Sequence, residues 1–264
     1  MEIIDAHAHI YPAKIAEKAT EAIGEFYDIK MAMPAGVPER LIENGKKAGI
    51  SRFVVHSCAT KPAQVRPINE FIKREMDEHK EFLGFMTLHQ DLTEEQVYEE
   101  VEWCVKNGFK GVKLHPDFQK FYIDDKSAEK FYRAVGDKLP ILFHTGDDRY
   151  EYSKPHRLAA VAKKFKDVKF IGAHFGGYRC WDELDCYAGL DNMYFDTSSS
   201  LPFISKEKAE NLIRKFGADR FFFGTDFPMW NAVEEIARFN ALSLTERERK
   251  KIFAYNLKGL LKLN

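Results

Sequence analysis

The sequence predicts an α/β protein of the (β/α)8 class, a TIM barrel formed by a single domain over residues 1–264. Eight short apolar runs alternate with helical patterns, and such alternation is typical of parallel strands joined by helical crossovers. A length of 264 residues suits one barrel, and no stretch has the composition of a linker. A histidine pair follows the first strand, where a doubly wound nucleotide-binding sheet would carry a glycine-rich turn.

The predicted strands are rich in Val, Ile, Leu and Phe, as expected for strands that are buried on both faces. Strands are predicted at 3–12 (ended by a proline), 51–58, 82–89, 109–115, 139–144, 168–174, 192–197 and 220–225. Helices are predicted at 13–27, 38–49, 64–79, 93–107, 125–137, 156–165, 182–190, 205–216, 231–242, 245–255 and 256–263. The connection from Tyr11 to Gly49 is the longest, and we expect it to form a lid or a subunit contact.

The composition excludes several classes of partner. Forty basic side chains balance forty-one acidic ones, and no basic stripe suited to nucleic acid occurs. No apolar run is long enough to span a bilayer, so we expect neither a membrane nor a nucleic acid as partner, but a small-molecule substrate. The four cysteines form no C-x-x-C pair and no N-terminal signal pattern is present, so a reduced, cytoplasmic location is expected.

The first strand carries the motif His7-Ala8-His9. Because side chains alternate between the two faces of a strand, His7 and His9 are expected to project together from its end. Two imidazoles in that arrangement can bind one metal ion. A polar strand end without a metal is the alternative, and the motif alone does not decide between them.

The ends of the other predicted strands also carry titratable side chains. In order they are His7, His9, His56, His89, Lys113, His115, His144, His174, Asp196 and Asp226. Seven of the nine histidines therefore lie at strand ends, and only His79 and His156 do not. Active sites of (β/α)8 barrels lie at the carboxyl ends of the strands, and imidazoles with one carboxylate form a zinc-type site that is open to water.

The runs DAHAHIYP, KLHP, FHTG, AHFGG and GTDFP follow one another at the ends of strands one, four, five, six and eight. In this order they resemble the amidohydrolase-related family of the metal-dependent amidohydrolase superfamily. That family contains (β/α)8 hydrolases and non-oxidative decarboxylases similar to aminocarboxymuconate-semialdehyde decarboxylase. The resemblance covers essentially the whole chain and implies that His7, His9, His144 and Asp226 bind a metal ion.

Further roles follow from the resemblance, with alternatives. Asp226 would also act as a base, and His174 would polarise the substrate or bind a second ion, unless it only supports the ligands. Lys113 would bridge two ions as a carboxylated lysine in binuclear relatives, whereas in mononuclear ones it would face the substrate. We expect one divalent ion rather than two, with zinc expected before manganese or iron. A homodimer is expected from the resemblance alone.

Four residues near the mouth are assigned to substrate binding. His115 would share a strand face with Lys113, and His56 ends the second strand, with a hydrogen-bonded structural histidine as the alternative for His56. Arg179 has the chemistry of a carboxylate clamp and Trp181 follows it, with a solvated loop as the alternative for both.

This set of residues predicts an enzyme. The main prediction is a hydrolase that activates water at the metal to cleave an amide, ester or lactone, with Asp226 as proton acceptor and His174 stabilising negative charge. The alternative is a metal-dependent non-oxidative decarboxylase of a small aromatic or unsaturated carboxylate. The two reactions use nearly the same residues, so the sequence does not separate them. A Schiff-base aldolase based on Lys113 would leave the histidines unexplained.

Overall fold

The computed structural model describes residues 1–263 and confirms the (β/α)8 barrel. Its eight strands are parallel and follow one another around the sheet in chain order. Their bounds are β1 Ile4–His9, β2 Arg52–His56, β3 Phe82–Met86, β4 Gly111–Leu114, β5 Ile141–Phe143, β6 Phe170–Gly172, β7 Met193–Asp196 and β8 Phe221–Phe222. Backbone hydrogen bonds from Ala6 to Phe223 (2.8 Å) and from Asp226 to His7 (2.8 Å) join the last strand to the first.

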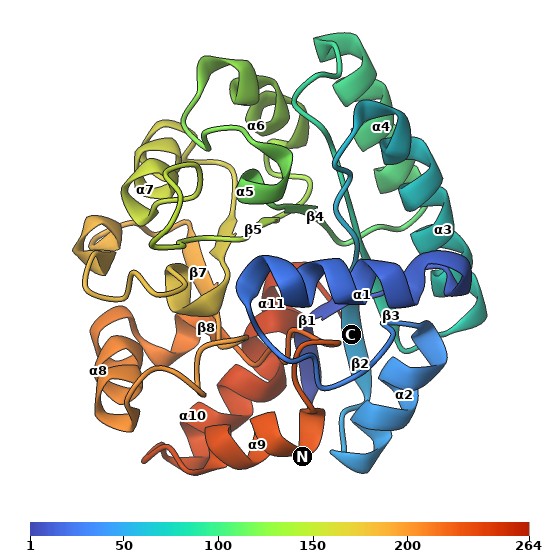
Figure 1. The fold of residues 1–264 in the computed structure, drawn as a ribbon. Coiled ribbons are helices and arrows are strands. Elements are labelled where there is room, and N and C mark those ends of the chain that lie inside the picture. The colour runs from blue at the N-terminus through green and yellow to red at the C-terminus, as the bar shows by residue number, and fades with distance from the viewer. Residues whose placement is uncertain (264) are drawn as a thin grey trace.

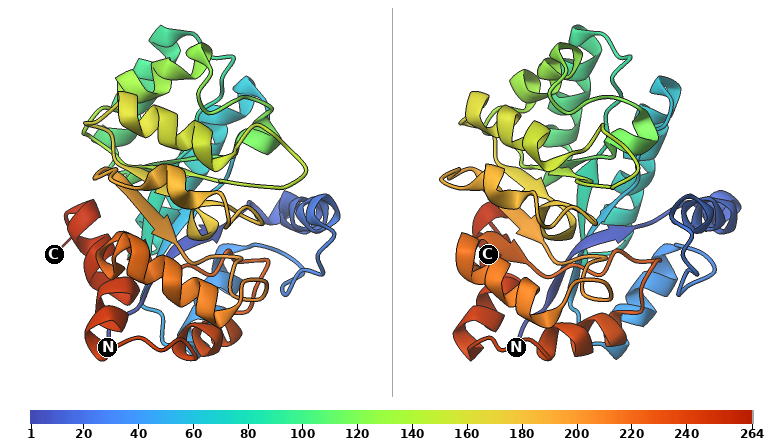
Figure 2. Two further views of the ribbon diagram at one scale, coloured as in Figure 1. Left: turned by 90° about the vertical axis from the view of Figure 1, so that its left-hand side faces the viewer. Right: turned by 60° about the vertical axis from the view of Figure 1, so that its left-hand side comes forward.

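Helices surround the sheet on the outside (Figures 1 and 2). They are α1 Ala13–Tyr27, α2 Pro38–Lys47, α3 Val65–Glu78, α4 Glu94–Lys106, α5 Pro116–Gln119, α6 Glu129–Val135, α7 Pro155–Lys164, α8 Lys206–Phe216, α9 Ala232–Asn240, α10 Glu246–Lys250 and α11 Asn256–Leu261. Helix α1 differs from the others, since it crosses in front of the strands in Figure 1 and stands out from the ring of helices in Figure 2. None of the described helices is both long and apolar enough to cross a membrane.

The structure departs from the predicted elements at two places near the barrel mouth. The helix predicted at 182–190 is only a 3₁₀ turn, Leu184–Tyr187, because Ala188 leaves the helical region (ψ 131°) and Gly189 is left-handed (φ 75°). Pro116 does not merely end a strand but begins α5, where it occupies the first helical turn. The side chain of His115 caps this helix by accepting a hydrogen bond from the Phe118 amide (3.3 Å).

The barrel interior is apolar below its mouth. Its inward-facing layer contains Ile4, Ala6, Val54, Leu83, Phe85, Leu142, Ile171 and Phe222, and α11 covers the lower end with Leu257 and Leu261. Lys113 is paired in register with Leu142, so it enters this interior from β4, where it is fully buried. The buried amine stands just above an apolar floor, and a charged group in that position needs partners at the mouth.

A β-bulge in β1 determines which way the histidine pair points. Asp5 is paired with Phe53 and Ala8 with Val55, so β1 holds one residue more than β2 over this span. Uninterrupted pairing would have placed Ala8 opposite His56. The bulge instead restores an inward orientation at the strand end, where His9 lies opposite His56. His7 and His9 therefore face the barrel interior although Ala6, just before them, also does.

Glu235 on α9 gives a prediction of pH-dependent stability. It is fully buried, its Oε1 pairs with Arg238, and its Oε2 has no partner among the described residues. Burial, opposed by Arg238, raises the pKa of Glu235 to about 7. Between the pKa of the unfolded chain and that value the folded protein holds an extra proton, so stability falls as the pH rises through this window.

We expect the Glu235→Gln variant of the metal-free protein to lose this dependence, which corresponds to about 3 kcal/mol at most between pH 4.5 and pH 8. Urea unfolding at the two pH values measures it. Glu234→Gln is the matched control, because Glu234 also pairs with Arg238 (3.0 Å) but is exposed. Equal pH slopes for the wild type and the Glu235→Gln variant would contradict the prediction.

Candidate metal centre

A cavity of about 20 Å³ lies at the carboxyl ends of the strands, a size suited to one water molecule or ion. Most residues predicted for the site line it: His7, His9, Lys113, His115, His144, His174 and Asp226. Three predicted site residues, His56, Arg179 and Trp181, are not among its lining residues. The structure thus brings together the predicted ligands from β1 and from the segments after β5 and β8, which are far apart in sequence.

The hydrogen bonds of three histidines fix their tautomers. His7 Nδ1 lies 2.9 Å from a carboxylate oxygen of Asp196, His144 Nε2 lies 3.1 Å from the Gly146 carbonyl, and His174 Nδ1 lies 3.0 Å from the Ser198 carbonyl. Each of these nitrogens must carry the proton, because its partner can only accept. The other nitrogen of each ring therefore keeps its lone pair.

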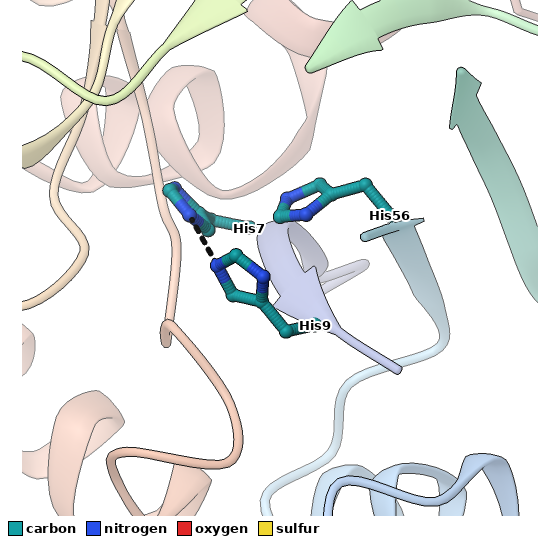
Figure 3. Close-up of side chains that lie close together, drawn as sticks. All are labelled: His7, His9 and His56. Carbon is teal, nitrogen blue, oxygen red and sulfur yellow. Dashed lines mark hydrogen bonds between the residues drawn. The ribbon is translucent and has the colours of Figure 1, made fainter. Parts of the chain in front are cut away.

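Those lone pairs face one another in the cavity. His7 Nε2 lies 3.3 Å from His9 Nε2, which can donate a hydrogen bond to it (Figure 3). His144 Nδ1 and His174 Nε2, both unprotonated, are 2.9 Å apart. Two neutral imidazoles whose lone pairs meet at such distances repel each other unless a cation lies between them or beside them. The donor set therefore fits a divalent metal ion, and the imidazole partners outside the cavity are those that metal ligands usually have.

Asp226 supplies the carboxylate of this set. Its Oδ1 lies 3.3 Å from the Nε2 atoms of both His7 and His9, and its Oδ2 accepts a hydrogen bond from Ser199 (2.5 Å). Burial would raise the pKa of Asp226, but His7 and His9 hold it well below its usual range. Asp226 is therefore ionised at neutral pH, as a metal ligand or a proton acceptor must be.

The histidines, by contrast, are uncharged at neutral pH. Burial, followed by the charge of Lys113, lowers the pKa of His7 to about 4, and burial also lowers the pKa values of His9, His144 and His174. These imidazoles are consequently neutral at pH 7 and able to ligate.

The side chain of Lys113 also brings a positively charged group to the cavity, next to His7. Its Nζ lies 3.1 Å from His7 Nε2, on the side where the ring has its lone pair. Burial lowers the pKa of this amine. The position suits either a group that binds a substrate carboxylate or one that delivers a proton, and whether Lys113 is carboxylated stays a prediction of the resemblance.

Asp196 orients the centre from outside the cavity. Besides His7, its carboxylate accepts hydrogen bonds from the backbone amides of His174 (3.1 Å) and Ser198 (3.0 Å). Burial opposes ionisation, yet the charge of His7 and the hydrogen bond with it lower the pKa of Asp196 to about 2. With this many donors Asp196 acts as the partner of two site residues rather than as a ligand.

Tyr27 is a site residue that the sequence analysis missed. It comes from the last turn of α1, and its hydroxyl lies 2.9 Å from His115 Nε2 and 3.3 Å from His144 Nε2. The connection from Tyr11 to Gly49 is predicted to form a lid or a subunit contact, but no local sequence signal marks Tyr27 as the aromatic residue of α1 that lines the cavity.

A stack of three rings, with His115 in the middle, borders the cavity next to Tyr27. The ring of His115 is parallel to those of His144 and Phe118, with centroid distances of 4.0 and 3.7 Å and interplanar angles of 7°. Both ring nitrogens of His115 have partners, the Tyr27 hydroxyl and the Phe118 amide. His115 is therefore held on both faces and at both nitrogens, and the substrate-binding role predicted for it stays a prediction.

Arg179 and Trp181 lie behind the cavity. Arg179 is exposed and its guanidinium stacks on the ring of Phe203 at 3.7 Å. The indole N–H of Trp181 donates to the carbonyl of His174 (3.0 Å) and so fixes the backbone that carries this histidine. Their predicted contacts with substrate stay predictions.

A larger cleft of about 960 Å³ opens beside the centre. It runs between α1 and the start of α3, and it shares His9, Ile23 and Phe118 with the small cavity. The end of α1 is fastened to the loop after β5, because Arg149 donates to the carbonyl of Phe26 (2.6 Å) and pairs with Asp147 (2.7 Å). The cleft is the open side of the centre.

Fold and site together define the class: a (β/α)8 enzyme whose histidines and carboxylate suit a divalent metal ion. The chain belongs to the amidohydrolase family, whose sequence model matches residues 4–261. This match confirms the family resemblance seen in the strand-end motifs. Among curated protein sequences, none matches the chain significantly.

Solved structures show the same fold at low sequence identity. An uncharacterised TIM-barrel protein from Bordetella bronchiseptica has a TM-score of 0.82 and 17% identity, with 99% of each chain covered. A dihydroxybenzoic acid decarboxylase from Polaromonas sp. JS666, with bound manganese and the inhibitor 2-nitroresorcinol, has a TM-score of 0.75 and 18% identity, covering 99% of this chain and 97% of that one. A 5-carboxyvanillate decarboxylase from Sphingomonas paucimobilis has a TM-score of 0.77 and 12% identity, covering 100% of this chain and 99% of that one.

Proposed function

We propose that this protein is a metal-dependent non-oxidative decarboxylase of a small aromatic or unsaturated carboxylate. The observation that carries the proposal is that the cation site adjoins a larger cleft with aromatic side chains in its lining. A planar carboxylate would place its charge toward His7, His9 and Lys113 and its ring toward Phe118, which lines both the cavity and the cleft. Two of the solved structures similar to this chain are decarboxylases of substituted benzoates, which agrees with the proposal.

When bound by His7, His9, His144 and Asp226, the metal would supply a fixed positive charge that holds the substrate and stabilises negative charge on it. Decarboxylation breaks the bond between the ring carbon and the carboxylate. The electron pair stays on the ring carbon, carbon dioxide leaves, and a proton takes its place. The chain must therefore orient the carboxylate, exclude water and provide that proton.

Lys113 is the residue we assign to the proton. Asp226 has a pKa held well below its usual range, so it does not carry a proton at neutral pH. Burial makes the ammonium of Lys113 a stronger acid than lysine in water, and its Nζ lies inside the cavity. His174 faces the substrate position with its unprotonated Nε2, and Tyr27 closes the mouth from α1.

Hydrolysis of an amide, ester or lactone is the second candidate. The ionised carboxylate of Asp226 favours it, since this group stands 3.3 Å from two ligand nitrogens and can accept a proton from water there. The substrate of a hydrolase would need a carbonyl carbon at the same position. Zinc and manganese are both compatible with this reaction and with decarboxylation.

The two functions are separated by product analysis. The purified protein, loaded with zinc or manganese, is incubated with hydroxylated benzoates and with a panel of lactones and esters. We expect release of carbon dioxide from a benzoate, in amounts matching the arene formed, and no release by the variant lacking His7 and His9. Cleavage of a lactone or ester, with every benzoate left intact, would show that the protein is a hydrolase and not a decarboxylase.

A further inference from the structure

A third histidine stands beside the pair from β1. His56 is the last residue of β2 and lies directly opposite His9 in the register of the two strands. Its ring centroid is 4.4 Å from that of His9 and 4.9 Å from that of His7, in both cases edge to face. Figure 3 shows the three rings converging from the two adjacent strands.

His56 is buried without a hydrogen bond. Its exposed fraction is 0%, and neither Nδ1 nor Nε2 has a partner among the described residues. Buried imidazoles in folded proteins nearly always have such partners. The structural alternative considered for this residue, a hydrogen-bonded histidine, therefore does not describe it.

The residues around His56 could hold a metal ion, which would be the missing partner of its ring. One nitrogen from each of His7, His9 and His56 lies within 4.8 Å of the others. Ligand nitrogens around a tetrahedral zinc ion are about 3.3 Å apart, because each lies 2.0–2.1 Å from the ion. A small rotation of the rings would bring the three nitrogens to the spacing of zinc ligands.

In two other clusters of this kind near the cavity the imidazoles already have hydrogen-bond partners, although Oδ1 of Asp117 in one of them has none among the described residues. In the group of His7, His174 and Asp196, the carboxylate accepts bonds from imidazole and backbone donors. In the group of His115, Asp117 and His144, both nitrogens of His115 have partners. Of these three groups, the one with His56 has a member with two free nitrogens.

We propose that His56 is a ligand of the metal ion held by His7 and His9. The inference rests on the metal dependence of the proposed function and adds β2 to the strands that supply ligands. It also bears on the choice of metal, because every added imidazole favours zinc over manganese, which prefers oxygen ligands. The protein should therefore select zinc when both ions are offered.

The test measures metal affinity directly. Metal-free wild type and the His56→Leu variant are titrated with Zn²⁺ against a chromophoric chelator, and with Mn²⁺ separately. Removing a residue that only supports a ligand costs 10–100-fold in affinity, so we expect a loss of about 100-fold or more for Zn²⁺ and a smaller one for Mn²⁺. The control is His89→Leu, which removes another buried strand-end histidine that does not line the cavity.

Circular dichroism of the metal-free variants checks the fold, and His56→Asn replaces His56→Leu if the latter does not fold. The visible absorption of the Co²⁺ protein gives a second readout, since loss of a ligand alters the spectrum. Unchanged Zn²⁺ affinity and an unchanged Co²⁺ spectrum, with metal binding lost in His7→Leu, would overturn the role of His56 and leave the proposed function intact. A wild type that binds no divalent ion would overturn both.

Discussion

Replacing both His7 and His9 with alanine is expected to abolish metal binding and, with it, turnover. The Nε2 atoms of the two rings lie 3.3 Å apart, and both lie 3.3 Å from the same oxygen of Asp226. Each lost ligand should cost about 100-fold in affinity, so the double variant should bind about 10⁴-fold more weakly and retain no metal through dialysis. Elemental analysis of the purified protein measures this.

The matched control removes the two histidines that lie outside strand ends, with the changes His79→Ala and His156→Ala. Both residues lie on or next to surface helices, and neither lines the cavity. This variant should retain the metal content of the wild type. A double variant of His7 and His9 that kept its metal would show that the ion is bound elsewhere.

The change Asp196→Asn should weaken metal binding 10–100-fold without removing any ligand. Asp196 accepts the Nδ1 proton of His7 on one oxygen and backbone N–H groups on the other. An asparagine can present its oxygen to only one of these sides. If its amide faces His7, the imidazole proton moves to Nε2 and the lone pair in the cavity is lost, and if it faces the backbone, donors oppose donors.

Zinc titration of the metal-free Asp196→Asn protein measures the effect. Ser198→Ala is the companion variant, because it removes a hydroxyl that donates to Asp196 (2.5 Å) and leaves the carboxylate in place. We expect a smaller loss for it. Equal zinc affinity for the wild type and Asp196→Asn would show that the tautomer of His7 does not depend on this carboxylate.

The barrel and the side chains gathered at its mouth were predictable because their signals are local. Short apolar runs alternate with amphipathic ones, and His144 and Asp226 follow such runs directly. Since all strands of a parallel barrel end at one face, strand-end residues can be placed together without knowing any contact. The prediction of seven histidines at strand ends required no more than this.

Register and tertiary approach were not predictable in the same way. Simple alternation gives His7 and His9 the same face, but it also adds Asp5 to that face. Asp5 is instead paired with Phe53, and the bulge that follows it turns His7 and His9 to the other face. Tyr27 approaches the centre because α1 folds back over the mouth, which no pattern within the helix indicates. Pro116 and the capping side chain of His115 are signals for the start of α5, whereas the prediction only ended a strand at this proline.

The fastening of α1 gives the protein a filter on what reaches its centre. With Arg149 holding one end of this helix, traffic passes through the cleft between α1 and α3, whose walls are mainly apolar side chains such as Ile15, Phe71 and Tyr150. Two lysines, Lys18 and Lys120, also line that passage. For the substrate proposed above, the apolar walls would accommodate a flat ring and the two lysines would attract its carboxylate, whereas a strongly hydrated neutral solute would gain neither contact. Selection between solutes would then begin in the cleft, before any of them reaches a histidine.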